Sequence, residues 1–82
     1  MPIAIVAIDL AKDIFELAAA DETGKVIERR RLNRRTLENY FGGLQSVQIV
    51  MEACGTAHHW ARRFADMNHR VSLPPPHYVR GA

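Results

Sequence analysis

Near its N-terminus the chain carries an uninterrupted apolar run that ends on an acid. Residues Ile3 to Ile8 contain no polar side chain, and Asp9 follows them directly. A strand that is buried on both faces has this composition, because neither face needs polar side chains. A second mostly apolar run, Val47 to Met51, ends on Glu52 in the same way. We therefore predict two interior strands, each with a carboxylate just past its apolar part.

Two further strands are expected early in the chain. Phe15 to Ala19 and Val26 to Leu32 are joined by the sequence Asp21 to Gly24, which has the composition of a hairpin turn. Charged residues alternate along the second of these strands, so at least one of its faces is polar. We expect this strand at an edge of the sheet, where charge discourages pairing with other strands.

Apolar residues at helical spacing predict two helices. The first is expected to begin at Asn33 or Thr36, which suit an N-cap, and to end at Gly42–Gly43. The second is expected to begin at Thr56 and to end at Asn68. Their core-facing positions are Leu37, Phe41 and Leu44 in the first helix and Trp60, Phe64 and Met67 in the second.

The last predicted strand is Arg70 to Leu73, so the order of elements along the chain is β-β-β-α-β-α-β. The first three strands are joined by short turns and should form an antiparallel meander. A crossover helix allows the fourth strand to run parallel to the first, which is its most apolar partner. We predict an α/β fold with a mixed sheet whose strand order, numbered along the chain, is 3-2-1-4-5.

This sheet would bring Asp9 and Glu52 together. Both would follow the C-terminal ends of parallel neighbours roughly 4.8 Å apart, at the edge where open α/β sheets bind ligands. Two close carboxylates repel each other, and Mg²⁺ or Mn²⁺ removes that penalty and can serve phosphoryl transfer. The alternative is structural, because Asp9 can start a turn and Glu52 can cap the following helix.

Basic charge is concentrated in one stretch. The net charge of the 82 residues is only +2, yet five of the eleven basic residues lie in the segment RRRLNRR. Such a cluster can bind phosphate without reading bases; the alternative is a solvated strand end and loop. Lys12, close to Asp9, could reach a phosphate or be a solvated turn residue. The candidate nucleic-acid contacts are Lys12, Arg29, Arg30, Arg31, Arg34 and Arg35.

The composition of the chain limits the cellular compartment and the kind of metal site that we expect. A single cysteine, Cys54, excludes an intrachain disulfide and fits a reducing compartment. The apolar start lacks a basic n-region and meets Asp9 too early to span a membrane, so we expect a cytoplasmic protein with no membrane partner. A zinc site would need more ligands than Cys54, His58 and His59 offer, and Cys54 is better explained as a small buried filler.

Several short motifs occur together in the order of a known family. They are Ile8-Asp9-Leu10-Ala11-Lys12-Asp13, Met51-Glu52-Ala53-Cys54-Gly55, Trp60, Asn68-His69-Arg70-Val71 and Pro76-His77-Tyr78-Val79. In this combination the chain resembles the N-terminal domain of the DEDD transposases of bacterial insertion sequences (the IS-one-ten group, related to the Piv/MooV invertases). Asn68 stands where the family usually has Gly, which alters only a helix cap because Asn also tolerates the left-handed conformation.

The resemblance implies an RNase H-like (RuvC-like) fold in which Asp9 and Glu52 are the first two catalytic, metal-binding acids of a tetrad. It also implies Mg²⁺-dependent DNA strand exchange, a guide RNA, oligomers and a serine nucleophile on a C-terminal domain. In the family the last two acids and that domain lie further along than Ala82. We therefore expect a truncated single domain over residues 1–82, incomplete at its C-terminus, with weak metal binding and no activity alone.

Two other interpretations stay open at this point. One is a non-catalytic module that binds nucleic acid or pairs with a full-length transposase. The other is a remnant reading frame without a function.

Overall fold

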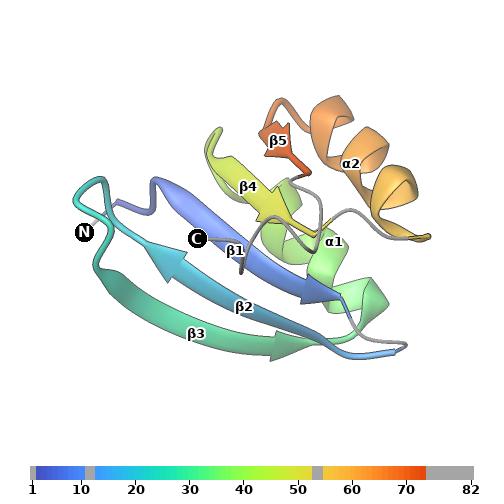
Figure 1. The fold of residues 1–82 in the computed structure, drawn as a ribbon, viewed down its shortest axis with the longest axis horizontal. Helices are drawn as coiled ribbons and strands as arrows, with labels where there is room; N and C mark the ends of the chain where they lie inside the picture. The colour runs from blue at the N-terminus through green and yellow to red at the C-terminus, as the bar shows by residue number, and fades with distance from the viewer. Residues whose placement is uncertain (1, 11–12, 53–54, 74–82) are drawn as a thin grey trace.

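The chain folds into a five-stranded mixed sheet with two helices, and the computed structural model describes residues 2–10, 13–52 and 55–73 (Figure 1). The element order is the predicted one. Lys12, Cys54 and the segment Pro76 to Val79 lie outside the described residues. The elements are β1 (Ile5–Leu10), β2 (Phe15–Ala20), β3 (Val26–Leu32), α1 (Arg34–Gly42), β4 (Gln48–Met51), α2 (Ala57–Asp66) and β5 (Arg70–Ser72).

The strands lie in the order β3-β2-β1-β4-β5, which confirms the predicted topology and places β3 at an edge. β1 is central, since it pairs antiparallel with β2 and parallel with β4. The parallel pairing sets Ile8 opposite Met51. Asp9 and Glu52 are the residues that directly follow this last pair.

Both helices pack on one face of the sheet, which we call the covered face. In β1 this face carries Val6 and Ile8, and in β4 it carries Ile49 and Met51. The predicted core positions of the helices are confirmed: four are buried, and Leu44 and Met67 are partly buried against the same cluster. Neither helix is long and apolar enough to cross a membrane. The buried helix positions are Leu37 and Phe41 in α1 and Ala57, Trp60 and Phe64 in α2.

The helix ends follow the predicted capping residues. The Asn33 side chain accepts a hydrogen bond from the Thr36 backbone N–H (2.9 Å), and the Thr36 hydroxyl accepts one from the Asn33 N–H (3.0 Å). The two candidate N-caps thus form one capping box. Thr56 occupies the N-cap position of α2. After that helix Asn68 adopts φ 71°, the left-handed conformation that ends helices and that Asn tolerates.

The turn between β2 and β3 is built on Asp21. Its carboxylate accepts hydrogen bonds from the Thr23 hydroxyl (2.6 Å), the Thr23 N–H (2.9 Å) and the Lys25 N–H (3.1 Å). The bond from the Thr23 hydroxyl is the main reason that the pKa of Asp21 lies below its usual value. Gly24 supplies the positive φ of 90° that the turn requires, as its position in the sequence predicts.

A buried histidine joins α1, β4 and the segment before β5. His69 is 5% exposed, and its Nδ1 accepts a hydrogen bond from the Val47 N–H (3.1 Å). Its Nε2 lies 2.9 Å from the carbonyl oxygen of Phe41. Because a backbone N–H can only donate, Nδ1 carries no proton, and Nε2–H donates to that carbonyl. Both ring nitrogens are therefore satisfied by backbone groups.

The other face of the sheet, which we call the open face, corrects one prediction. β1 is not buried on both faces: Val6 and Ile8 are buried, but Ile5 is 37% exposed, and Ala7 and Asp9 are exposed. The connections β3–α1–β4 and β4–α2–β5 both step across the sheet in the same direction. Right-handed crossovers in one direction place their helices on one face. No element among the described residues covers the other face.

Candidate metal centre and nucleic-acid interface

Asp9 and Glu52 lie side by side on the open face. Asp9 is the fifth residue of β1, and Glu52 directly follows β4, one step past the last paired residues of the two parallel strands. Both are exposed, and together with Ile8 and Leu10 they line a hollow of about 380 Å³. The topology therefore brings the two acids to one place, and their role as metal ligands stays a prediction.

The structural alternatives are a turn at Asp9 and a helix cap at Glu52. β1 continues through Leu10, and the residues that a turn from Asp9 would need lie outside the described part of the chain. Glu52 does not cap α2, because Thr56 holds the N-cap position. No salt bridge within the described ranges involves either carboxylate. Two exposed neighbouring carboxylates that pair with no described cation fit the oxygen ligands that Mg²⁺ and Mn²⁺ prefer.

Two acids are only part of a metal site. Within residues 2–10, 13–52 and 55–73, no three His, Cys, Asp or Glu side chains are grouped so that they could hold a metal ion. His58 and His59 are exposed at the start of α2. Cys54, the one thiol, lies outside these ranges.

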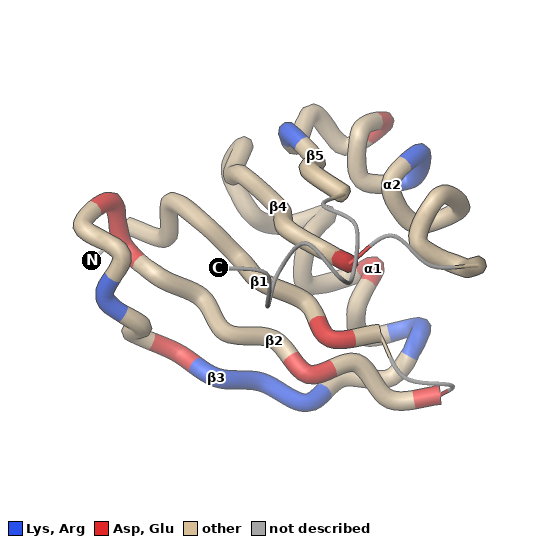
Figure 2. Tube along the Cα trace, viewed as in Figure 1, with Lys and Arg blue, Asp and Glu red and all other residues tan. Residues whose placement is uncertain are grey.

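A third carboxylate, Glu16, continues the row of acids across the sheet. Asp9 pairs with Glu16 in the antiparallel register of β1 and β2, and Glu16 pairs with Arg31 in that of β2 and β3. Figure 2 shows acidic segments at the ends of β1 and β4 and in β2, with a basic stretch in β3 beyond them. Glu16 is not among the site residues predicted from the sequence, although its position opposite Asp9 follows from the hairpin register.

Arg29 and Arg31 share the open face with these acids. Arg31 Nη2 lies 2.9 Å from Glu16 Oε2, whereas Arg29 makes no ion pair with any described residue. Small residues separate Arg29 from β1, because Ala18 pairs with both Ala7 and Arg29. A hollow of about 520 Å³ is lined by Ala7, Ile8, Asp9, Glu16, Leu17, Ala18, Arg29, Arg30 and Arg31.

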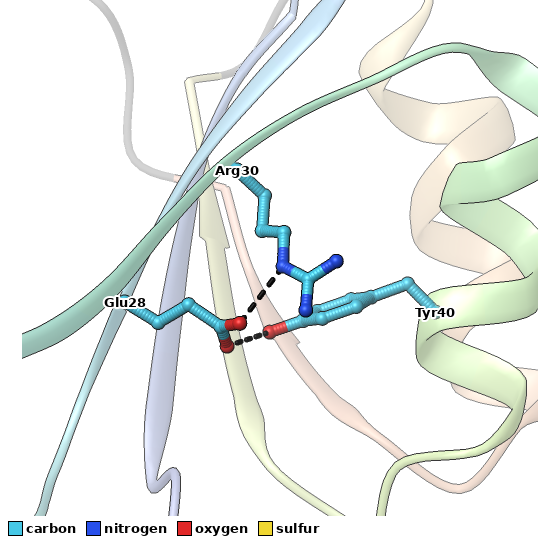
Figure 3. Close-up of polar contacts among 3 residues, drawn as sticks. All are labelled: Glu28, Arg30 and Tyr40. Atoms are coloured by element: carbon cyan, nitrogen blue, oxygen red, sulfur yellow. Dashed lines mark hydrogen bonds and ion pairs between the residues drawn. The ribbon is translucent and has the colours of Figure 1, made fainter.

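Arg30 lies on the covered side of β3 and is held by α1 (Figure 3). Its Nε lies 2.8 Å from Glu28 Oε2, and its guanidinium carbon lies 5.5 Å from the centroid of the Tyr40 ring. The Tyr40 hydroxyl donates to Glu28 Oε1 at 3.2 Å. The structure therefore separates Arg30 from Arg29 and Arg31, with which the sequence had grouped it.

Contacts among these three side chains shift the pKa values of Glu28 and Tyr40. The hydrogen bond from Arg30 is the main reason that the pKa of Glu28 lies below its usual value. Burial, followed by the nearby Glu28 carboxylate, raises the pKa of Tyr40 to about 12. Across the physiological pH range, Arg30 therefore contacts a neutral Tyr40 and an ionised Glu28.

Arg34 and Arg35 begin α1 beyond the end of β3. Both are exposed, and neither makes a salt bridge with a described residue. Cations at a helix N-terminus oppose the helix dipole, so these two residues do not stabilise α1 by their charge. They remain candidate phosphate contacts at the β3 end of the molecule.

Comparison with known proteins places the chain among relatives of transposases. It is 42% identical over 78 residues to the transposase for insertion sequence element IS1111A of Coxiella burnetii, covering 95% of this chain and 21% of that protein. It is 36% identical over 80 residues to a Pseudomonas aeruginosa protein named "Probable family 20 transposase", covering 98% and 24%. The transposase for IS1328 of Yersinia enterocolitica is 30% identical over 78 residues, covering 95% and 23%.

These relatives support the predicted resemblance to insertion-sequence transposases. The chain spans about a quarter or less of the length of each of these curated relatives, while almost all of the chain itself is matched. No family model matches the chain.

Proposed function

We propose that this chain supplies the first two acids of a metal site for DNA strand exchange by an insertion-sequence transposase. The domain would be RNase H-like (RuvC-like) and of the DEDD type. One observation carries the proposal: Asp9 and Glu52 stand exposed on neighbouring parallel strands, in one hollow, in a chain related to transposases. The mixed sheet in the order 3-2-1-4-5 supports this fold assignment.

Asp9 and Glu52 would hold Mg²⁺ or Mn²⁺ through carboxylate oxygens. The ion, when bound, would polarise a phosphodiester oxygen and neutralise the charge that develops during displacement. The proposal places the DNA backbone on the open face, which carries both carboxylates and, within the described part of the chain, no helix. The two acids alone leave most of the ion's coordination to water, so we expect weak binding.

DNA is the proposed partner, with a guide RNA and an oligomer with a full-length transposase as further partners. The names of the relatives support DNA in general terms. Exposed arginines on and beyond β3 would contact phosphates without reading sequence. The proposed phosphate contacts are Lys12, Arg29, Arg31, Arg34 and Arg35. Arg30 is excluded from this set because it contacts Glu28 and Tyr40.

A Mn²⁺ titration followed by NMR tests the metal site directly. Mn²⁺ broadens amide signals near its binding site, so the signals around Asp9 and Glu52 should broaden first, at millimolar concentrations. Asp9→Asn and Glu52→Gln should each abolish this local broadening. Asp66→Asn, which removes an exposed acid on α2, is the matched control and should leave it unchanged.

Broadening that survives the Asp9→Asn, Glu52→Gln double variant would place the ion elsewhere and refute the proposal. We also expect no DNA cleavage by the chain alone, because a two-metal displacement needs more ligands than two carboxylates. Mg²⁺-dependent cleavage that Asp9→Asn removes would instead mean that a complete site assembles, for example between two copies.

The alternative function is a non-catalytic nucleic-acid-binding or subunit-interaction module. The exposed arginines favour it, since they need no metal to bind phosphate. DNA binding that is identical in EDTA and in Mg²⁺, combined with a negative Mn²⁺ titration, would support this alternative.

A further inference from the structure

Two similar ion pairs lie on opposite sides of β3. Arg30 pairs with Glu28 at 2.8 Å, and Arg31 pairs with Glu16 at 2.9 Å. The first pair is partly sheltered, with side chains 50% and 31% exposed, and Tyr40 binds Glu28 as a third partner. The second pair is 70% and 58% exposed.

The exposed pair adds little to folding, because both partners remain hydrated and the two side chains lose freedom when they meet. Stability therefore does not account for a carboxylate at Glu16, next to Asp9, where it adds a third negative charge to the row. For the same reason the guanidinium of Arg31 can exchange its partner at small cost. An anion that binds more strongly than Glu16 would replace it.

The position of Arg31 indicates which anion could replace Glu16 as its partner. It stands two strands from Asp9 in the same row, which is about 10 Å at the usual strand spacing. Arg29 lies two residues away on the same face, above a floor of Ala7 and Ala18 that leaves room for an approaching chain. One DNA strand carries a phosphate about every 3.4 Å of helix axis, so a backbone that crosses this row can bring more than one phosphate to it.

We propose that Glu16 holds the place of a DNA backbone phosphate on Arg31, and that DNA crossing the open face toward Asp9 displaces it. The inference rests on the proposed function, because it takes DNA as the partner. Arg29 and Arg31 then bind phosphates of the strand that reaches Asp9 and Glu52. Glu16 acts as an internal competitor, so the affinity of the surface for DNA is lower than its arginines alone would give.

Fluorescence anisotropy with a short fluorescein-labelled DNA duplex tests this proposal on the 82-residue chain. EDTA is present throughout, so that no metal at Asp9 and Glu52 contributes. Glu16→Gln and Glu28→Gln each remove one negative charge from a pair with an arginine, which matches their general electrostatic effects. We expect Glu16→Gln to bind about two- to fivefold more tightly than Glu28→Gln at low salt, the range set by an exposed salt bridge.

The arginines provide the second comparison. Arg31→Gln should weaken binding and flatten the log–log salt slope by about 0.9, which corresponds to one lost phosphate contact. Arg30→Gln should leave the slope near that of the wild type. In the Arg31→Gln background, Glu16→Gln should lose its advantage over Glu28→Gln, because the two residues act as a pair. Urea midpoints check that every variant is folded.

Equal affinities of Glu16→Gln and Glu28→Gln would overturn the proposal, as would equal slopes for Arg30→Gln and Arg31→Gln. The same pattern with an RNA duplex but not with DNA would assign the surface to RNA and also overturn it. The two proposals fail separately. A negative result in EDTA leaves the Mn²⁺ result at Asp9 and Glu52 standing, and a negative Mn²⁺ titration leaves the competition between Glu16 and phosphate standing.

Discussion

The covered and open faces of this sheet use the same strands for different purposes. On the covered face Val6 and Ile8 of β1 are at most 5% exposed and meet the aromatic side chains of both helices. On the open face the alternate residues of the same strand, Ile5 and Asp9, are exposed. The difference teaches that the side of the sheet, and not the apolar character of a strand, decides which residues stabilise the fold and which remain available to a ligand.

The largest expected effect comes from the same substitution on the two faces. Ile49 on the covered face is 0% exposed, and Ile5 on the open face is 37% exposed. Ile49→Ala should lower the free energy of unfolding by about 2–5 kcal/mol, because it leaves a cavity in the core. Ile5→Ala should cost less than about 1 kcal/mol. Urea denaturation measures both, and equal losses would mean that the open face is covered after all.

The next effect concerns the buried histidine on the covered side. His69→Leu leaves the buried Val47 N–H without its partner, at about 1–3 kcal/mol for an unsatisfied buried group, whereas the Phe41 carbonyl still accepts a hydrogen bond from the Leu44 N–H (3.3 Å). His59→Leu changes an exposed histidine and serves as the control, with little change expected. Unfolding curves that coincide for the two variants would show that the His69 bridge contributes nothing.

The smallest effect is a pH dependence at Tyr40, where the covered side meets β3. Its pKa in the folded chain is raised to about 12, against about 10 for an unperturbed tyrosine. The contribution of Tyr40 to stability is therefore present below pH 10 and is lost as the pH rises from about 10 to about 12. Solvent screening keeps this contribution small, because the ring is only partly buried.

Tyr40→Phe provides the measurement for this last prediction. The variant has no phenol to ionise, so its unfolding free energy should fall less steeply between about pH 10 and 12 than that of the wild type. In a pH titration of the wild type followed by tyrosinate absorbance, Tyr40 should ionise at a higher pH than an ordinary tyrosine. Parallel stability curves for the two proteins would contradict the placement of Tyr40 between Glu28 and Arg30.

Much of the fold followed from local patterns in the sequence. Helical spacing located Phe41 and Trp60, and side-chain chemistry located the N-cap at Asn33 and the left-handed residue Asn68, which directly follows the C-cap of α2, Met67. The strand order followed from short turns and one crossover, which leave few topologies open. The juxtaposition of Asp9 with Glu52, the residue that follows β4, was predicted from that topology alone.

The remaining features depend on contacts that no local pattern encodes. The apolar composition of β1 does not say that both helices lie on one side, so Ile5 was taken as buried. Arg30 and Arg31 are adjacent in sequence, and only the orientation of β3 separates them. Tyr40 of α1 reaches Glu28 of β3 on the covered side, which the spacing of either element alone does not reveal.

The pairing of β1 has a consequence for how the chain reaches this structure. One neighbour of β1, the strand β2, follows it directly along the chain, whereas the other neighbour, β4, comes only after β2, β3 and α1. The hairpins can close quickly, but Val6 and Ile8 lack most of their cover until the long segment between β1 and β4 has looped back. Loop-closure entropy is lost before these contacts form, and non-local contacts slow folding. We expect this parallel pairing, which also brings Asp9 and Glu52 together, to form late in folding.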